Sequence, residues 1–190
     1  RSCQSRGLGD VYKRQAQNYY SDTNYLILVN SKTHKVGVFK GSSYNWQLVW
    51  YWNCTTGAPG SPTVKGTYKV GSRGKSFGSG YTCWYWTQFY GNYLFHSVLY
   101  QPGSMSRIQD GRLGISASHG CVRLDIECAR WIYNNIPTEP GLFLLIDELL
   151  VGGGEPDPWL RIGLFSLAAM DGRMHGIASL SLIHISEPTR

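Results

Sequence analysis

The chain has 190 residues, of which 42% are hydrophobic and 16% charged, and this composition is typical of a globular protein and not of a disordered one. Its formal net charge of +6 suits an anionic partner, but an ordinary solvated surface explains the charge at least as well, and no dense run of Lys and Arg supports nucleic-acid binding. No stretch reaches the ~20 apolar residues of a membrane-spanning helix. The five cysteines form no CxxC pair, which argues against a zinc site.

The early part of the chain predicts a meander of antiparallel strands. Runs of β-prone residues cover 25–29, 36–39 and 46–52, and turn-forming residues at 31–34 and 41–43 separate them. Such short strands, joined by tight turns, pair with their neighbours in sequence. The first half of the chain therefore predicts a mainly β fold.

Breaker residues then alternate with further β-prone runs. We predict a loop over residues 56–62 and a mobile, glycine-rich segment over 71–80. Additional strands are predicted over residues 67–70, 81–90 and 93–100.

A single strong helix signal follows later in the chain. Asp125 is placed to cap the first turn, Glu127 lies in that turn, and Pro137 ends the helix. Apolar residues recur at helical spacing, namely Ile126, Ala129, Ile132, Tyr133 and Ile136. A buried strand over 142–146 then closes the domain, so the prediction is a β meander with one helix.

The two ends of the chain do not share this pattern. Residues 1–15 and 148–190 show no clear period, so we expect the domain to span residues 16–147. Parts of these ends, 11–15 and 181–190, resemble translated sequencing-adapter sequence. We interpret the first end as an artefact or a disordered leader and the second as a tail that is partly artefact, with genuine tails as the alternative.

The sequence Ser118-His119-Gly120-Cys121 holds the strongest chemical signal. A cysteine beside glycine and histidine on a short loop is suited to be a nucleophile, because imidazoles and backbone N–H groups lower a thiol pKa. His96, from a separate strand, is the preferred base, and His119 is the alternative. The competing interpretation of Cys121 is an inert buried thiol.

Neighbouring residues are predicted to support this pair. Ser97 is expected to fix the His96 ring through its carbonyl or hydroxyl oxygen. The backbone N–H groups of His119, Gly120 and Cys121 are expected to stabilise negative charge on a substrate oxygen.

Arg123 and the remaining cysteines leave alternatives open. Arg123 either binds a substrate carboxylate or holds the loop through backbone carbonyls. Cys54 and Cys83 both lie in the β-rich half and are candidates for a disulfide in an oxidising compartment. Cys128 lies on the predicted helix and is interpreted as a core residue.

His96 and the stretch Ser118-His119-Gly120-Cys121-Val122-Arg123 together resemble the signature of the L,D-transpeptidases with a YkuD-type catalytic domain. Upstream, residues 61–70 resemble the family stretch Thr-Pro-x-Gly-x-Phe-x-Val, with a two-residue insertion and Tyr for Phe. The resemblance covers residues 24–147. The spacer between His96 and Ser118 is longer than is usual in the family. The additional residues fall in 101–114, a segment that is a candidate lid over the cleft.

The resemblance implies an antiparallel β-sandwich with one helix beside the active-site loop. It implies that Cys121 attacks the third residue of a peptidoglycan stem tetrapeptide, that D-Ala leaves, and that the amine of a second stem resolves the thioester as a 3→3 cross-link. His96 would move the proton. Stem peptides and the anionic cell wall are the implied partners, carbapenem-type inhibitors are expected, and no cofactor is required.

The implied location is extracellular or in the cell wall, and because the chain lacks an initiator Met and a signal peptide we interpret it as a fragment. Other functions stay open. Water as acceptor would give an L,D-carboxypeptidase, and a cell-wall-binding module would retain only the fold. A papain-like amidase is disfavoured, because there the cysteine precedes the histidine in the chain.

Overall fold

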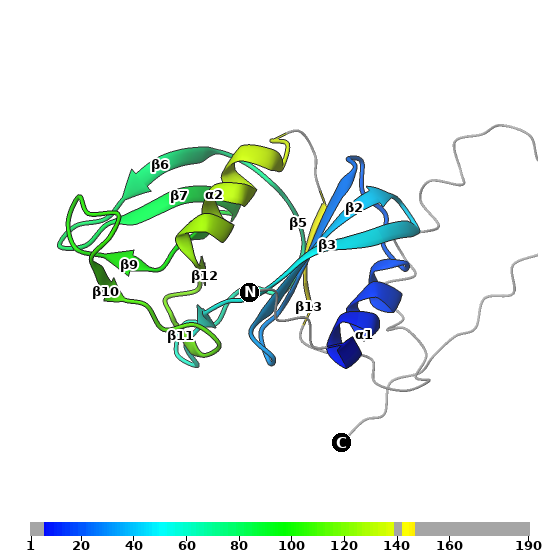
Figure 1. Cartoon of the computed structure of the whole chain (residues 1–190), viewed down its shortest axis with the longest axis horizontal. Coiled ribbons are helices and arrows are strands. Elements are labelled where there is room, and N and C mark those ends of the chain that lie inside the picture. Colours follow the sequence, from blue (N-terminus) through cyan, green and yellow to red (C-terminus); the bar gives the residue numbers. More distant parts are fainter. Residues whose placement is uncertain (1–5, 139–141, 147–190) are drawn as a thin grey trace, which may run out of the picture. The chain divides into compact units, whose positions relative to one another are not determined.

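The computed structural model describes residues 6–138 and 142–146, which form two main β-sheets and two helices (Figure 1). The chain divides into two compact units, residues 1–151 and 152–190, and every described residue belongs to the first. The prediction of a mainly β fold is confirmed. No helix in the described part of the chain combines the length and the apolar character that a membrane crossing needs.

The first sheet has five strands in the order β3-β2-β1-β13-β5. Their bounds are Asn45–Asn53 for β3, Lys35–Ser42 for β2, Tyr25–Asn30 for β1, Leu142–Ile146 for β13 and Gly66–Lys69 for β5. The first three strands are antiparallel, as the meander predicts, whereas β13 runs parallel to β1 and antiparallel to β5. The last strand therefore inserts into the middle of the sheet.

The second sheet has four strands in the order β12-β8-β7-β6. Their bounds are Val122–Leu124 for β12, Tyr93–Ser97 for β8, Cys83–Tyr90 for β7 and Arg73–Phe77 for β6. Two short pairs join β9 (Leu99–Tyr100) to β10 (Ile108–Asp110) and β4 (Thr56–Gly57) to β11 (Ser116–Ser118). The strand predicted over 93–100 is thus two strands, β8 and β9.

Strand β6 corrects the prediction that residues 71–80 form a mobile loop. Gly74 lies opposite Trp86 on β7, and a Cβ atom at Gly74 would lie 2.5 Å from the indole Nε1. The glycine is therefore a site of close cross-strand packing and not a chain breaker. Arg73 extends from the same strand and donates to the carbonyl oxygens of Tyr133 and Ile136, at the end of the helix.

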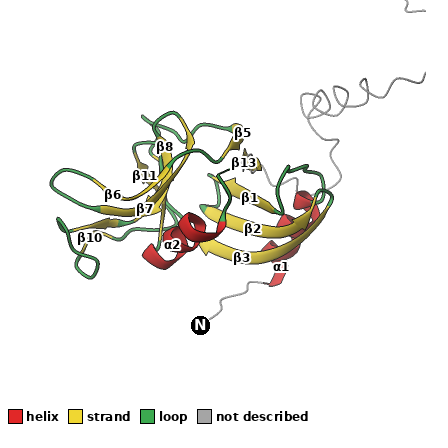
Figure 2. Cartoon of the chain, turned by 90° about the horizontal axis from the view of Figure 1, so that it is seen from above, coloured by secondary structure: helices red, strands yellow, loops and turns green. Residues whose placement is uncertain are grey.

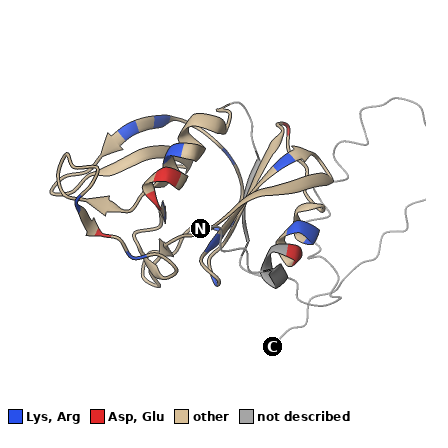
Figure 3. Ribbon diagram, viewed as in Figure 1, with Lys and Arg blue, Asp and Glu red and all other residues tan. Residues whose placement is uncertain are grey.

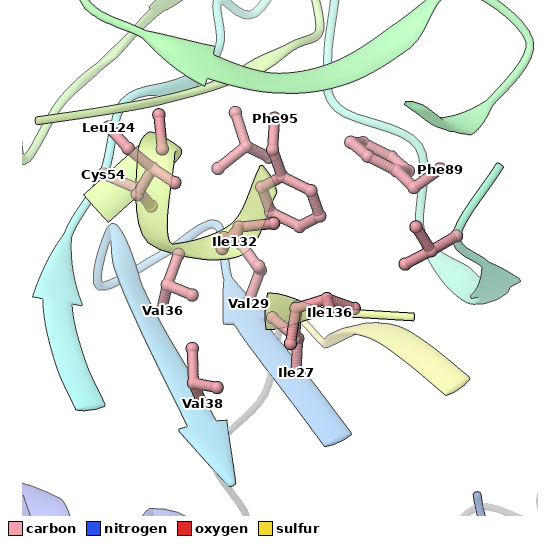
Figure 4. Close-up of a cluster of buried hydrophobic side chains, with 13 residues drawn as sticks. Ile27, Val29, Val36, Val38, Cys54, Phe89, Phe95, Leu124, Ile132 and Ile136 are labelled. Carbon is pink, nitrogen blue, oxygen red and sulfur yellow. The ribbon is translucent and has the colours of Figure 1, made fainter. Parts of the chain in front are cut away.

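The main core lies between the two sheets and helix α2 (Ile126–Asn135). Side chains alternate along a strand, so Ile27 and Val29 of β1 face this core, where they meet Phe95 and Ile132 (Figure 4). Asp125 caps α2 as predicted, accepting a hydrogen bond from the amide of Glu127 at 2.9 Å. Because α2 directly follows β12, this packing also positions the loop before β12.

The opposite face of the first sheet is covered by a helix that the sequence analysis did not predict, α1 (Arg6–Ala16) (Figure 2). Leu26 and Leu28 face it, and Tyr12 is fully buried against them. The structure thus differs from the interpretation of residues 1–15 as lacking a regular element. The apolar residues Leu8, Val11, Tyr12 and Ala16 do recur at helical spacing, but the helix is short and two glycines, Gly7 and Gly9, weaken its signal. The boundaries of the domain stay a prediction.

Candidate active site

The loop that carries Cys121 connects β11 to β12. Ser118 closes this loop, since its hydroxyl donates to the carbonyl of Cys121 at 2.6 Å and accepts from the amide of Gly120 at 3.1 Å. Gly120 has a φ of 112°, a backbone conformation that favours glycine. A side chain at Gly120 would also collide with the ring of Tyr93, because a Cβ there would lie 2.5 Å from its Cε1 atom.

The Cys121 sulfur is partly buried beside the turn between β7 and β8. Its thiol donates a weak hydrogen bond to the carbonyl oxygen of Asn92 at 3.6 Å. Burial raises the pKa of this thiol above its ordinary value, while the backbone of Leu94 and the charge of Arg123 act in the opposite direction. Cys121 is therefore a neutral thiol in the resting protein.

His96 is held beside Cys121 by parallel strand pairing. Strand β12 follows the loop directly and pairs with β8 so that Arg123 lies opposite His96. The Nδ1–H of His96 donates to the carbonyl oxygen of Ser97 at 2.6 Å, which leaves Nε2 as the basic nitrogen. The Ser97 hydroxyl instead donates to the carbonyl of Val98. Ser97 thus acts on the ring through its carbonyl, one of the two ways predicted.

Burial keeps the His96 ring neutral. The side chain is buried and packs edge-on against Phe77, with ring centroids 5.1 Å apart. The pKa of His96 is lowered to about 4, mainly by burial and to a small extent by the charge of Arg123, while the hydrogen bond to Ser97 partly opposes these effects. At neutral pH the histidine is thus available as a proton acceptor.

Cys121 and His96 line one pocket of about 140 Å³. Its other lining residues are Phe77, Tyr81, Cys83, Leu99, Ser118, His119 and Arg123. The tertiary structure therefore brings the predicted nucleophile and base into one concave site. Within the described part of the chain, no hydrogen bond joins the Cys121 thiol to His96, because the thiol is directed toward Asn92.

Arg123 joins the pocket to the 101–114 segment. Its Nη1 donates to Asp110 Oδ2 at 3.2 Å, and Asp110 also binds the exposed Arg112. The backbone N–H of Arg123 donates to the carbonyl oxygen of Thr55 at 2.8 Å, and the N–H of Thr55 donates to the carbonyl oxygen of Arg123 at 2.9 Å. The Arg123 Nε is buried without a partner among the described residues.

A family model for the L,D-transpeptidase catalytic domain, YkuD, matches residues 24–152. The chain belongs to this family. It is 43% identical over 82 residues to the provisionally named L,D-transpeptidase YciB of Bacillus subtilis (strain 168). The aligned segment covers 40% of this chain and 42% of YciB. The chain thus spans less than half the length of this curated relative.

Solved structures agree with the family fold. A fused Zn-dependent amidase/peptidase/peptidoglycan-binding domain-containing protein from Clostridium acetobutylicum ATCC 824 is similar with a TM-score of 0.59 and 34% identity, covering 76% of this chain and 65% of that one. An L,D-transpeptidase from Stackebrandtia nassauensis has a TM-score of 0.52 at 16% identity, over 68% of this chain and 58% of its own. At that identity the second likeness concerns the fold alone.

Several pocket residues of this YkuD-family domain differ from the sequence-based assignments. Cys83 and Cys54 are both free, so the disulfide that the sequence left open is not formed: Cys54 lies in the main core, whereas Cys83 lines the pocket. Gly120 donates its N–H to Ser118 and is not free to bind a substrate oxygen in this state. His119 is exposed at the pocket rim.

The sequence analysis did not identify Asn92 or Asp110 as residues of the site. Neither residue belongs to the Ser118–Arg123 motif, and each reaches it only through tertiary contacts. The one available signal was the polar turn Tyr90-Gly91-Asn92 between two predicted strands, which indicates a hairpin but not its neighbour in space.

Proposed function

We propose that this protein is a peptidoglycan L,D-transpeptidase with Cys121 as its nucleophile and His96 as its general base. The observation that supports this most directly is that one pocket holds the Cys121 sulfur together with an imidazole fixed in the Nδ1–H form. The membership in the YkuD family supplies the substrate class. We also propose an extracellular or wall-associated location, which the substrate requires.

The reaction starts from a neutral thiol and a neutral imidazole. On substrate binding the Cys121 S–H turns from Asn92 to the Nε2 of His96, which accepts its proton as sulfur attacks the carbonyl carbon of the third stem residue. The tetrahedral intermediate then collapses, and the protonated His96 gives that proton to the leaving amine of D-Ala. A thioester between Cys121 and the donor stem remains.

The second half of the reaction runs in reverse order. The side-chain amine of an acceptor stem attacks the thioester carbonyl and transfers a proton to His96. The C–S bond breaks, the Cys121 sulfur takes the proton back from His96, and a 3→3 cross-link is released. If water replaces the amine, the product is a tripeptide, and the same residues act as an L,D-carboxypeptidase.

Negative charge on the substrate oxygen needs hydrogen-bond donors. Since the amide of Gly120 is bonded to Ser118, we assign this role to the backbone N–H groups of His119 and Cys121, which flank it. Arg123, which lines the pocket, is proposed to bind the substrate, while Asp110 holds its guanidinium.

The experiment that tests the function incubates the full chain with purified disaccharide tetrapeptide and follows the products by mass spectrometry. A cross-linked dimer that lacks one D-Ala, absent with Cys121→Ala, is the expected result, and a tripeptide alone would indicate a carboxypeptidase. Cys128→Ala is the matched control, because Cys128 lies on α2 and does not line the pocket. No turnover by a folded wild-type chain would contradict the proposal and favour a wall-binding module.

A carbapenem provides an independent probe of the nucleophile. We expect a mass increase of one inhibitor molecule on the wild-type chain and on Cys128→Ala, and none on Cys121→Ala. Peptide mapping should place the adduct on Cys121. An adduct that persists in Cys121→Ala would place the reactive group elsewhere.

A further inference from the structure

Three tyrosines form a continuous strip beside the catalytic loop, and we call Tyr68, Tyr90 and Tyr93 the tyrosine strip. The ring centroids of Tyr68 and Tyr90 are 4.9 Å apart, and those of Tyr90 and Tyr93 are 6.1 Å apart. Tyr68 comes from β5 in the first sheet, whereas Tyr90 and Tyr93 come from β7 and β8 in the second. The strip therefore bridges the two sheets at the surface.

A β-bulge produces this arrangement. The register between β7 and β8 shifts between Gln88 and Tyr90, which leaves Phe89 as an extra residue and pairs Tyr90 directly with Tyr93. A bulge re-aims the side chains around it, and such irregularities often serve a site. Here Phe89 is buried, with its ring centroid 6.0 Å from Tyr68 and 6.2 Å from Tyr93.

The outer side of the strip is open. Tyr90 is 53% exposed, one of the most exposed large hydrophobic residues in the described part of the chain, while Tyr68 and Tyr93 are partly buried against the main core. The Tyr68 hydroxyl donates to the carbonyl of Lys65 at 2.7 Å, which helps to fix its ring. Strands β7 and β8 hold no Lys, Arg, Asp or Glu (Figure 3). The strip thus presents supported aromatic faces and not an ionic surface.

The strip begins at the nucleophile. Tyr93 packs against Gly120, the residue before Cys121, and Asn92 accepts the Cys121 thiol hydrogen bond from the same turn. The tyrosine strip does not line the 140 Å³ pocket, whereas Cys121 does, and Cys121 also directly follows Gly120, which Tyr93 contacts. A substrate that reaches Cys121 can therefore contact both.

We infer that the tyrosine strip binds a sugar ring of the glycan strand that bears the stem under attack. This inference rests on the proposed function. In the substrate, the first two residues of the stem peptide and a short linker separate the attacked third residue from the sugar. At ~3.5 Å per extended residue, this separation is roughly 7–11 Å. A pyranose ring has a flat C–H face for aromatic stacking, whereas a D-Ala methyl or a diamino-acid chain has none. Tyrosine combines such a face with a hydroxyl for polar sugar groups.

The test compares wild type and three variants on two donors. We expect Tyr90→Ala to lower kcat/KM about tenfold on the disaccharide tetrapeptide and to leave kcat/KM on the free tetrapeptide within about twofold of wild type. Tyr90→Phe keeps the stacking face and should retain most of the activity on both donors. Tyr20→Ala is the matched control, because Tyr20 has a similar exposure of 49% and lies before β1.

Three outcomes would overturn the inference. The first is an equal loss of kcat/KM by Tyr90→Ala on both donors, which would mean that the strip binds the peptide. The second is no loss of kcat/KM on either donor. The third is a loss by Tyr20→Ala as large as that by Tyr90→Ala. If the wild-type chain turns over neither donor, the proposed function fails, and binding of the peptide-free disaccharide by calorimetry still decides the inference. In that calorimetry, wild type and Cys121→Ala should bind the disaccharide, and Tyr90→Ala should bind it about tenfold more weakly. No binding of the disaccharide by wild type would reject the inference about the strip.

Discussion

The Nδ1 of His96 lies 2.6 Å from the carbonyl oxygen of Ser97, the next residue in the chain. This bond fixes the tautomer of a buried imidazole and directs Nε2 as the free nitrogen. The carbonyl that does this belongs to β8, which also pairs with the strand that leaves the Cys121 loop. The orientation of His96, the proposed base, and the position of Cys121, the proposed nucleophile, are therefore set by one strand pair.

The pH dependence of stability should report on His96. Its pKa in the folded protein is lowered to about 4, against about 6.5 for an unfolded histidine. Between these values the unfolded state binds more protons, so the free energy of unfolding falls as the pH falls from 6.5 toward 4, by at most about 1.4 kcal/mol per pH unit. Urea unfolding at pH 7, 6, 5 and 4.5 measures this fall.

His96→Gln removes the titrating group and should flatten this part of the profile. The comparison is between slopes, so any difference in stability at pH 7 does not affect it. Asp110 titrates lower, since its pKa is lowered to about 2 by Arg112 first and by Arg123 to a smaller extent. Parallel profiles for wild type and His96→Gln between pH 6.5 and 4.5 would contradict the prediction.

Gly120→Ala should damage both folding and activity. The new Cβ would lie 2.5 Å from the Tyr93 ring, and the φ of 112° is strained for alanine, at a cost of about 1–3 kcal/mol. We expect a lower melting temperature and a slower rate of Cys121 acylation per folded molecule. Tyr93→Ala should relieve only the collision, so the double variant should be less destabilised than the sum of the single ones. Additive effects would mean that Tyr93 does not restrict Gly120.

Asp110→Asn tests the ion pair with Arg123. The Arg123 side chain is 9% exposed, so loss of its partner leaves a buried charge, and we expect a loss of about 1.5–3 kcal/mol in the free energy of unfolding. Arg112→Gln is the matched control, because the Arg112 side chain is 64% exposed and its bond to Asp110 is worth at most about 1 kcal/mol. Equal effects of the two substitutions, measured by urea unfolding, would show that the Arg123 bond is not the important one.

Arg73→Met should destabilise the protein without altering the chemistry. Arg73 donates to the carbonyls of Tyr133 and Ile136 and so binds the C-terminal end of α2 to β6. We expect a loss of about 1–3 kcal/mol in unfolding free energy, with carbapenem acylation of folded protein unchanged. Lys75→Met, at an exposed position of the same strand, should stay within about 0.5 kcal/mol of wild type. A large loss of acylation by Arg73→Met would link the helix end to the site.

Local sequence patterns determined most of the strands and the helix after the catalytic loop. The β-prone runs of β1, β2 and β3 are interrupted by turn residues, and α2 has both an Asp125 cap and apolar residues at helical spacing. Each of these signals acts within a few residues, which is why it can be read without a tertiary structure. The same pattern could not reveal β6, because Gly74 serves a cross-strand neighbour.

The sequence by itself determined which residues to propose for the site, since Ser118, His119, Cys121 and His96 all line the one pocket. Only the tertiary structure decided which other residues reach them. Asn92 at the thiol, Asp110 on Arg123 and Tyr93 on Gly120 come from separate turns and strands. Strand register and a β-bulge bring them there, and both depend on pairing between distant segments, which no local pattern encodes.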